Sequence, residues 1–190
     1  MSTRDETLIY LTGFMGSGKS TIAPILANTL GYECADLDRE IEAATGRKVT
    51  ELFTEAGESA FRALELDILR RLSGRTACVV SLGGGTIVRE ENLRTVRSSG
   101  VLIYLQVGED QLYERLKNKN HRPMLWGDDG VILADDELRA RIRALFTERE
   151  PYYLQADLVI PVGSNRVGIT VDQIVTALRR RRTSPSKGPA

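Results

Sequence analysis

Short runs of apolar residues alternate along the chain with segments in which apolar residues recur every three or four positions. Unbroken runs of this length are typical of strands buried on both faces of a parallel sheet, and the recurring pattern is typical of amphipathic helices. The predicted strands are 8–11, 33–37, 77–82, 101–105 and 158–160. The predicted helices are one ending at Leu30, then 39–44, 49–56, 58–72, 90–98, 109–117 and 136–149, and a last one that includes 171–178.

Single residues set two of these boundaries. Gly57 separates the helices 49–56 and 58–72, and Pro151 is expected to end the helix 136–149 because proline cannot donate a helical hydrogen bond. Five strands alternating with helices predict an α/β fold, a three-layer α/β/α arrangement around a five-stranded parallel sheet. Such sheets bind ligands beyond the carboxyl ends of their strands.

The first predicted strand leads into a glycine-rich segment. Residues 13–20 read GFMGSGKS, a full match to the phosphate-binding loop pattern G-x-x-x-x-G-K-[ST]. The backbone N–H groups of such a loop surround a phosphate at the start of the following helix. Lys19 adds a positive charge for the outer phosphates, and the Ser20 hydroxyl is a ligand for Mg²⁺. A chance glycine turn is the alternative, but the four fixed positions and the flanking strand and helix favour nucleotide binding.

Composition adds mainly exclusions. The chain has 190 residues, of which 26 are basic and 26 acidic, so its net charge indicates neither nucleic acid nor a membrane as a partner. No stretch approaches the roughly 18 apolar residues of a membrane span, and the start lacks the apolar core of a signal peptide. Cys34 and Cys78 lie beside predicted strands without metal-ligand spacing, so buried thiols in a reducing cytoplasm are expected.

Two carboxylates follow the second predicted strand. Asp36 and Asp38 project from the same edge of the sheet as the phosphate loop, so one is predicted to join the Mg²⁺ shell and the other to face an acceptor hydroxyl. The alternative for Asp38 is a cap on the helix 39–44, because aspartate is a favoured N-cap residue. A generic P-loop ATPase has an acid at the end of the strand 77–82. Here that end is Ser81-Leu82, so Asp36 is the best substitute.

Two arginines and three glycines are candidates for holding an anionic acceptor. Arg62 borders the apolar stripe of its helix, and an ion pair with Glu58 one turn earlier explains it equally well. Arg149 continues the apolar face of the helix 136–149, so it is expected to point inward, toward an anionic ligand or a buried carboxylate. The triplet Gly83-Gly84-Gly85 allows a ligand to approach the backbone closely, or forms only a tight turn.

The segment from Lys117 to Asp135 interrupts the rhythm of strands and helices. It is basic at first and then rich in glycine and aspartate, which predicts a long, flexible and functional loop. Arg122 lies in this loop before Pro123. Near the end of the chain, four arginines lead into a polar segment that is predicted to be a disordered tail.

Taken together, these motifs resemble the shikimate kinase family. They occur in the family's order over about residues 8 to 180. The matching motifs are the phosphate loop with Thr21 (residues 13–21), Asp36-Leu37-Asp38, Phe61-Arg62, Ser81-Leu82-Gly83-Gly84-Gly85, Arg122-Pro123 and Arg149-Glu150-Pro151-Tyr152. The resemblance implies a P-loop NTPase fold of the nucleoside monophosphate kinase type, with sheet order 2-3-1-4-5. It implies ATP-dependent phosphorylation of the 3-hydroxyl of shikimate to shikimate 3-phosphate, a step of aromatic amino-acid biosynthesis by the chorismate route.

The resemblance also implies how the chain is organised. A single domain is expected over residues 1–182, with substrate-binding helices at about 36–73 and a lid at about 117–134. A flexible tail at 183–190 follows. The expected substrates are shikimate and ATP and the expected cofactor is Mg²⁺. A cytoplasmic monomer without nucleic-acid or membrane partners is expected.

The role of each matched residue is implied in the same way. Asp38, Lys19 and Arg122 are implied to be catalytic, with Asp38 as the candidate base, while Ser20 and Asp36 hold Mg²⁺. The residues implied to bind the nucleotide are Gly16, Ser17, Gly18, Lys19, Ser20, Thr21, Arg115, Arg122 and Arg166. A shift of one position in the loop would replace Arg166 by Val167. The residues implied to bind shikimate are Asp38, Arg62, Gly83, Gly84, Gly85 and Arg149.

Other functions share only part of this pattern. A kinase for gluconate or for a nucleoside monophosphate would have the phosphate loop but no expected need for the two arginines and the glycine triplet. A nucleotide-binding regulatory switch is expected to carry a guanine-reading motif such as N-K-x-D, and the sequence has none. An inactive homologue is disfavoured because Lys19, Asp36, Asp38 and Arg149 are all present. Phosphorylation of shikimate is therefore the predicted function.

Overall fold

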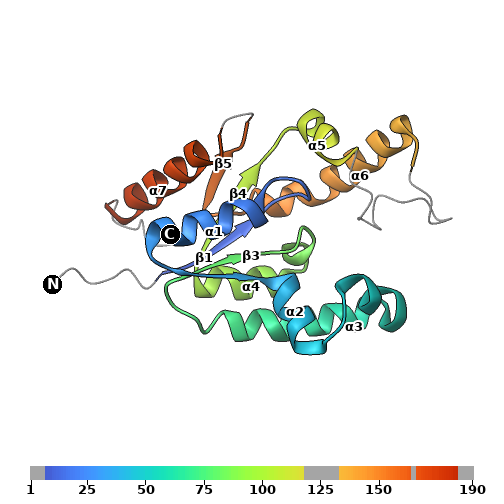
Figure 1. Cartoon of the computed structure of the whole chain (residues 1–190), viewed down its shortest axis with the longest axis horizontal. Coiled ribbons are helices and arrows are strands. Elements are labelled where there is room, and N and C mark those ends of the chain that lie inside the picture. Colours follow the sequence, from blue (N-terminus) through green and yellow to red (C-terminus); the bar gives the residue numbers. More distant parts are fainter. Residues whose placement is uncertain (1–6, 118–132, 164–165, 184–190) are drawn as a thin grey trace, which may run out of the picture.

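One parallel five-stranded sheet forms the centre of the protein. The computed structural model describes residues 7–117, 133–163 and 166–183. The strand order is β2-β3-β1-β4-β5, which confirms the predicted fold class and sheet order (Figure 1). The strands are β1 (Leu8–Thr12), β2 (Glu33–Asp36), β3 (Cys78–Ser81), β4 (Val101–Gln106) and β5 (Leu158–Pro161). The central strands β3, β1 and β4 are almost entirely buried, as their unbroken apolar runs predict.

Helices cover both faces of the sheet. On one face α1 packs against α7, and on the other α3 packs against α4, while α5 and α6 lie together beside the sheet (Figure 1). The helices are α1 (Lys19–Leu30), α2 (Leu37–Thr45), α3 (Val49–Leu72), α4 (Glu90–Ser99), α5 (Glu109–Leu116), α6 (Asp135–Tyr153) and α7 (Val167–Thr183). A short 3₁₀ turn, η1 (Thr86–Val88), follows β3.

Helix α3 is bent at the glycine that the sequence singles out. Gly57 has φ 79° and ψ 165°, a conformation that residues with a side chain rarely adopt, so the two predicted helical halves are confirmed. The bend places the Phe53 ring of the first half 4.2 Å from the Phe61 ring of the second half. The Arg62 guanidinium group lies beside this pair of rings, its carbon 5.6 Å and 5.4 Å from their centroids.

Two local expectations are wrong. Helix α6 continues through Pro151 to Tyr153, and the Leu154 amide still donates to the Glu150 carbonyl at 2.9 Å. Proline removes only its own N–H donation, and the fully buried Tyr153 anchors the last turn in the core. Cys78 is buried as expected, but Cys34 is exposed because β2 is an edge strand.

Several expectations fall on the undescribed part of the chain. Most of the expected lid, including Arg122, and all of the expected tail beyond Thr183 lie outside the described residues. Within the described ranges, no helix combines the length and the apolar character needed to cross a membrane.

Gly100, the residue between α4 and β4, provides a test of the packing against β1. A Cβ at this position would lie 2.4 Å from the carbonyl oxygen of Leu8 in β1, so alanine requires a backbone to move. We expect Gly100→Ala to lower the free energy of unfolding by about 2–3 kcal/mol, measured by urea denaturation. The control is Gly168→Ala in α7, where nothing lies within 4 Å of the added Cβ. It should raise stability by up to about 1 kcal/mol, and equal effects of the two changes would contradict the packing described here.

Candidate active site

Most of the predicted site residues line one cleft at the carboxyl ends of β1, β2 and β3, whereas Arg62, Gly85, Arg149 and Arg166 are not among its lining residues. The cleft has a volume of about 530 Å³. Its walls come from the phosphate loop, the ends of β2 and β3, α5 and the segment after β5. The predicted residues that line it are Gly16, Ser17, Gly18, Lys19, Ser20, Thr21, Asp36, Asp38, Gly83, Gly84 and Arg115.

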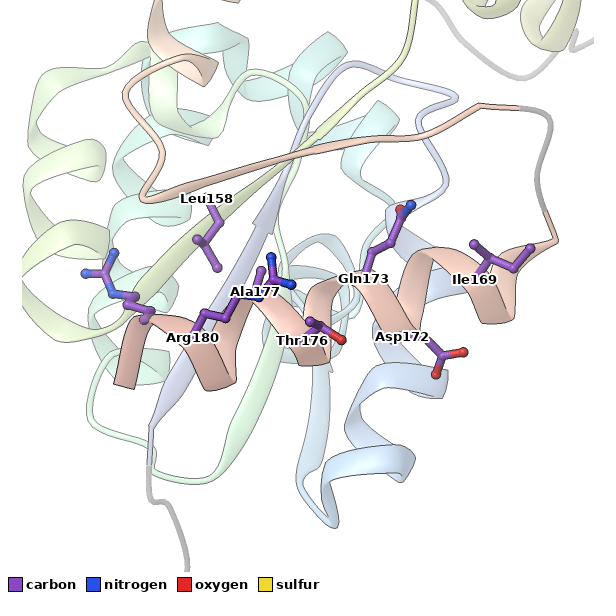
Figure 2. Close-up of a pocket in the computed structure, with 8 residues that line it drawn as sticks. Leu158, Ile169, Asp172, Gln173, Thr176, Ala177 and Arg180 are labelled. Atoms are coloured by element: carbon purple, nitrogen blue, oxygen red, sulfur yellow. The ribbon is translucent and has the colours of Figure 1, made fainter. Parts of the chain in front are cut away.

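A second hollow, of about 630 Å³, lies on the outside of the protein along α7 (Figure 2). It is lined by Leu158, Ile169, Asp172, Gln173, Thr176, Ala177, Arg180 and Arg181. None of these is a predicted site residue, and Leu158 lies at the amino end of β5, away from the ligand-binding ends of the strands. Although this hollow is larger, the chemistry belongs to the phosphate-loop cleft.

The phosphate loop owes its shape to three glycines. Gly13, Gly16 and Gly18 have φ values of 144°, 81° and 99°, which disfavour any residue with a side chain. A Cβ at Gly13 would also lie 2.8 Å from the carbonyl oxygen of Leu105 in β4. The loop therefore passes close to the sheet before α1 begins at Lys19, and the N-terminus of this helix faces the cleft, where Lys19, Ser20 and Thr21 line the wall.

Lys19 lies within the turn of this loop. Its Nζ donates to the carbonyl of Gly13 at 2.7 Å and to that of Phe14 at 3.0 Å, and it lies 3.5 Å from Ser17 Oγ. The ammonium group is thus held at the loop by backbone oxygens. A phosphate in the loop would compete for the same ammonium group, and a charged acceptor makes the stronger hydrogen bond.

Arg115 joins the phosphate loop to the segment after β5. Its Nη1 donates to the Gly16 carbonyl at 3.0 Å, and its Nη2 donates to the Gly163 carbonyl at 3.2 Å. In that segment Val167 lines the cleft, whereas Arg166 is exposed immediately before α7. The structure therefore places Arg115 and Val167, rather than Arg166, at the cleft wall.

Asp36 and Asp38 have different local roles. Asp36 ends β2 and pairs in register with Ser81, which ends the neighbouring strand β3. A generic P-loop ATPase carries an acid at the end of that strand. The Asp36 carboxylate therefore lies one strand away from that position. The Asp36 side chain also accepts the Arg39 amide at 3.3 Å and caps α2, which begins at Leu37. Asp38 lies inside the first turn of that helix, so the interpretation of Asp38 as the cap is wrong.

The surroundings of Asp38 favour its neutral form more than water does. Dense protein around the carboxyl group raises the pKa of Asp38 to about 6, and the nearby negative charges of Asp36 and Glu65 act in the same direction. The charge of Lys19 opposes the shift. The residue nonetheless keeps an exposed surface, so its carboxyl group is crowded on the protein side and open to solvent on the other.

Glu65 is a buried residue that the sequence analysis missed. Its side chain is 2% exposed and pairs with Arg62 Nη1 at 2.8 Å. It also accepts the Thr86 hydroxyl at 2.7 Å and the Asn92 amide at 3.4 Å. The expected pair between Arg62 and Glu58 is present at 3.4 Å, but Glu58 is largely exposed. Helical spacing of three from Arg62 was the signal that could have identified Glu65.

The glycine triplet 83–85 lies among the three predicted acceptor-binding side chains. A Cβ on the first glycine would lie 3.3 Å from Asp38 Oδ1, and one on the third would lie 3.1 Å from Arg62 Nη2. A Cβ on the middle glycine would lie 3.9 Å from Nη1 of Arg149, which is buried. The absence of side chains here allows the Asp38 carboxylate and the two guanidinium groups to approach the backbone of the triplet closely.

The donor atoms at the cleft fit a magnesium ion held together with phosphates. Ser20 and Asp36 both line the cleft and offer a hydroxyl and a carboxylate. Among the described residues, no group of three or more acids, histidines or cysteines is placed to hold a metal ion alone. In nucleotide sites Mg²⁺ takes one or two protein ligands and completes its shell with phosphate oxygens and water, which matches this pair.

The fold and the cleft together define a P-loop phosphotransferase, and comparisons with known proteins identify its family. The family model described as shikimate kinase matches residues 15–179. The shikimate kinase of Chlorobaculum tepidum is 45% identical over 184 residues, which are 97% of this chain and 96% of that protein. The structure of shikimate kinase from Acinetobacter baumannii in complex with shikimate has a TM-score of 0.85 and 28% identity, covering 95% of this chain and 97% of that chain.

The chain belongs to the shikimate kinase family. The family, the fold and the kinase class predicted from the sequence are therefore confirmed. A gluconokinase from Sinorhizobium meliloti matches with a TM-score of 0.60 and 20% identity, over 94% of this chain and 95% of that chain. That likeness shows a shared fold alone.

The two carboxylates that pair with Arg62 should differ greatly in their contribution to stability. We expect Glu65→Gln to lower the free energy of unfolding by about 3 kcal/mol, because the mostly buried Arg62 guanidinium group would keep only its longer, solvent-exposed pair with Glu58. Glu58→Gln should change it by less than about 0.5 kcal/mol, because that pair is open to water. Chemical denaturation of both variants and the wild type measures the difference, and similar losses in the two variants would argue against a dominant role for Glu65.

Proposed function

We propose that this chain transfers the γ-phosphoryl group of ATP to the 3-hydroxyl of shikimate. The observation that carries the proposal is the environment of the glycine triplet. Beside the phosphate loop, Asp38 lies next to its first glycine, Arg149 next to its second and Arg62 next to its third. A small acid that also carries hydroxyl groups matches this combination of one carboxylate and two guanidinium groups.

The phosphate loop supplies the nucleotide half of the reaction. The amides around Gly16, Ser17 and Gly18 and the start of α1 bind phosphate oxygens, and the Lys19 ammonium group moves from the loop carbonyls to the outer phosphates. Ser20 and Asp36 hold Mg²⁺, which when bound neutralises charge on the phosphates. Thr21 and Arg115 complete the nucleotide site. We assign the lid residue Arg122 to the same site on the family resemblance. Of the two candidates after β5, Val167 rather than the exposed Arg166 lies at the cleft wall.

Asp38 supplies the acceptor half. Its carboxylate accepts the proton of the 3-hydroxyl while the hydroxyl oxygen forms a bond to the γ-phosphorus and the bond from phosphorus to ADP breaks. Arg62 and Arg149 hold the carboxylate of shikimate, which fixes the distance between the bound acid and Asp38. Glu65 holds Arg62 in this position from beneath.

The organisation of the chain belongs to the same proposal. A single domain spans residues 1–182, its helices at about 36–73 receive the acceptor, and the segment at about 117–134 closes over the nucleotide. Closure excludes water, which would otherwise accept the phosphoryl group. We propose that the enzyme acts as a monomer, on the family resemblance.

A coupled assay with ATP, Mg²⁺ and a panel of acids tests the substrate. We expect ADP release with shikimate and release at least about 100-fold slower, judged by kcat/KM, with gluconate or a nucleoside monophosphate. The reason is that only a compact acid places a carboxylate between the two arginines and a hydroxyl at Asp38. Turnover of gluconate without turnover of shikimate would overturn the proposal.

Asp38→Asn tests the proposed base. The amide keeps the size of the side chain but cannot take a proton, so kcat with shikimate should fall on the order of 100-fold or more. The change also removes a negative charge that Asp36 and Glu65 crowd, so the melting temperature should stay equal or rise. Near-normal kcat in a folded variant would exclude Asp38 as the base.

A further inference from the structure

All three carbonyl groups of the glycine triplet are tied to the protein. The first and third accept the backbone amides of Thr86 and Val88 at 3.2 Å and 3.3 Å. The middle carbonyl, that of Gly84, accepts the side-chain hydroxyl of Tyr153. The amides of Gly84 and Gly85 have no hydrogen-bond acceptor within the described part of the chain. The triplet therefore presents donors without partners where an anion is proposed to bind.

The bond from Tyr153 fixes the direction of one of these donors. The described chain contains no cis peptide bond, so the Gly84 carbonyl and the Gly85 amide point in opposite directions from the same peptide plane. Tyr153 is fully buried and holds the carbonyl on the protein side. The Gly85 amide is thereby turned away from the core. Gly85 also lies close to Arg62, because a Cβ added to this glycine would be 3.1 Å from Arg62 Nη2.

The surroundings of Tyr153 suit a fixed donor. Its ring lies 5.2 Å from that of Tyr104 in β4, and burial raises the pKa of the Tyr153 hydroxyl, so the group keeps its proton. It also follows Arg149 by one helical turn on α6. The helix therefore brings a charged group and a hydroxyl group to the same glycine, Gly84.

We propose that Tyr153 is a positioning residue for the acceptor: by holding the Gly84 carbonyl, it directs the Gly85 amide at the carboxylate bound between Arg62 and Arg149. The inference rests on the proposed function and deepens it. It adds to the two arginines a backbone donor whose direction does not depend on a flexible side chain. The acceptor class that fits best is a monocarboxylic acid whose carboxylate oxygens can reach both guanidinium groups and this amide.

The chain offers a matched control in the neighbouring ring. Tyr104 is also fully buried and stacks on Tyr153, but its hydroxyl has no hydrogen-bond partner in the described structure. Tyr153→Phe and Tyr104→Phe each remove one buried hydroxyl and keep the ring. Only the first removes the contact with Gly84, together with the interaction between the Tyr153 hydroxyl and Arg149.

Steady-state kinetics of the full-length chain with ATP, Mg²⁺ and shikimate compare the two variants. Loss of a hydrogen bond worth about 1 kcal/mol should raise the KM for shikimate about five- to tenfold in Tyr153→Phe. The KM for ATP should stay within about twofold, because the nucleotide half does not contact this hydroxyl. In Tyr104→Phe both constants should stay within about twofold of the wild type.

Two kinetic outcomes would overturn the inference while leaving the proposed function intact. In one, the wild type phosphorylates shikimate, and the KM values for shikimate and for ATP are the same in Tyr153→Phe as in Tyr104→Phe. The other is an equal rise of both KM values in Tyr153→Phe, which would indicate a purely structural role. A wild type without activity on shikimate would instead overturn the proposed function, and this inference with it.

The amide resonance of Gly85 gives a second measurement that does not depend on turnover, and the spectrum itself shows whether a variant is folded. In ¹H–¹⁵N spectra of the wild type, saturating shikimate should move this resonance, because its proton gains a carboxylate acceptor. In Tyr153→Phe the movement should be smaller at equal saturation. A Gly85 resonance that shikimate leaves unmoved in the wild type would contradict the proposal.

Discussion

The phosphate loop and the glycine triplet meet backbone to backbone, with no side chain between them. A Cβ on Gly84 would lie 3.5 Å from the Met15 amide nitrogen and 3.6 Å from the Gly13 carbonyl oxygen. The Leu82 amide donates to the Leu11 carbonyl at 3.0 Å and joins the two strands directly below. The separation between phosphoryl donor and acceptor is therefore set by the spacing of adjacent strands, a rigid quantity, and in-line transfer depends on such fixed geometry.

Bringing these loops together also concentrates charge. After burial, which has the largest effect, the negative charges of Asp36 and Glu65 contribute to the raised pKa of Asp38. Glu65 is stabilised by three hydrogen-bond donors, one of them the guanidinium group of Arg62, whereas Asp38 is left facing the cleft. A carboxylate held among like charges costs stability, and this cost is the usual consequence of keeping a reactive group in place.

Much of the fold and of the nucleotide half could be predicted from sequence because the signals are local. Gly57 and the phosphate-loop glycines are required by their own backbone angles, and the strands by their own apolar runs. The contacts of Glu65 with Thr86 and of Tyr153 with Gly84 span 21 and 69 residues, so no local pattern contains them. The exposure of Cys34 depended on strand order, which only the family resemblance supplied.

Helix α6 shows why a local rule failed at a functional position. Near its start, Arg143 pairs with Glu109 at 3.1 Å and Arg139 lies 3.7 Å above the Tyr113 ring, which attaches α6 to α5 and so to the helix that carries Arg115. Its last turns carry Arg149 and Tyr153. A helix that ended before Pro151 would leave Tyr153 without the geometry that brings it to Gly84. The hydrogen bond lost at the proline is offset by the burial of that tyrosine, so tertiary packing overrides the local preference and keeps the last turn of the helix beside Gly84.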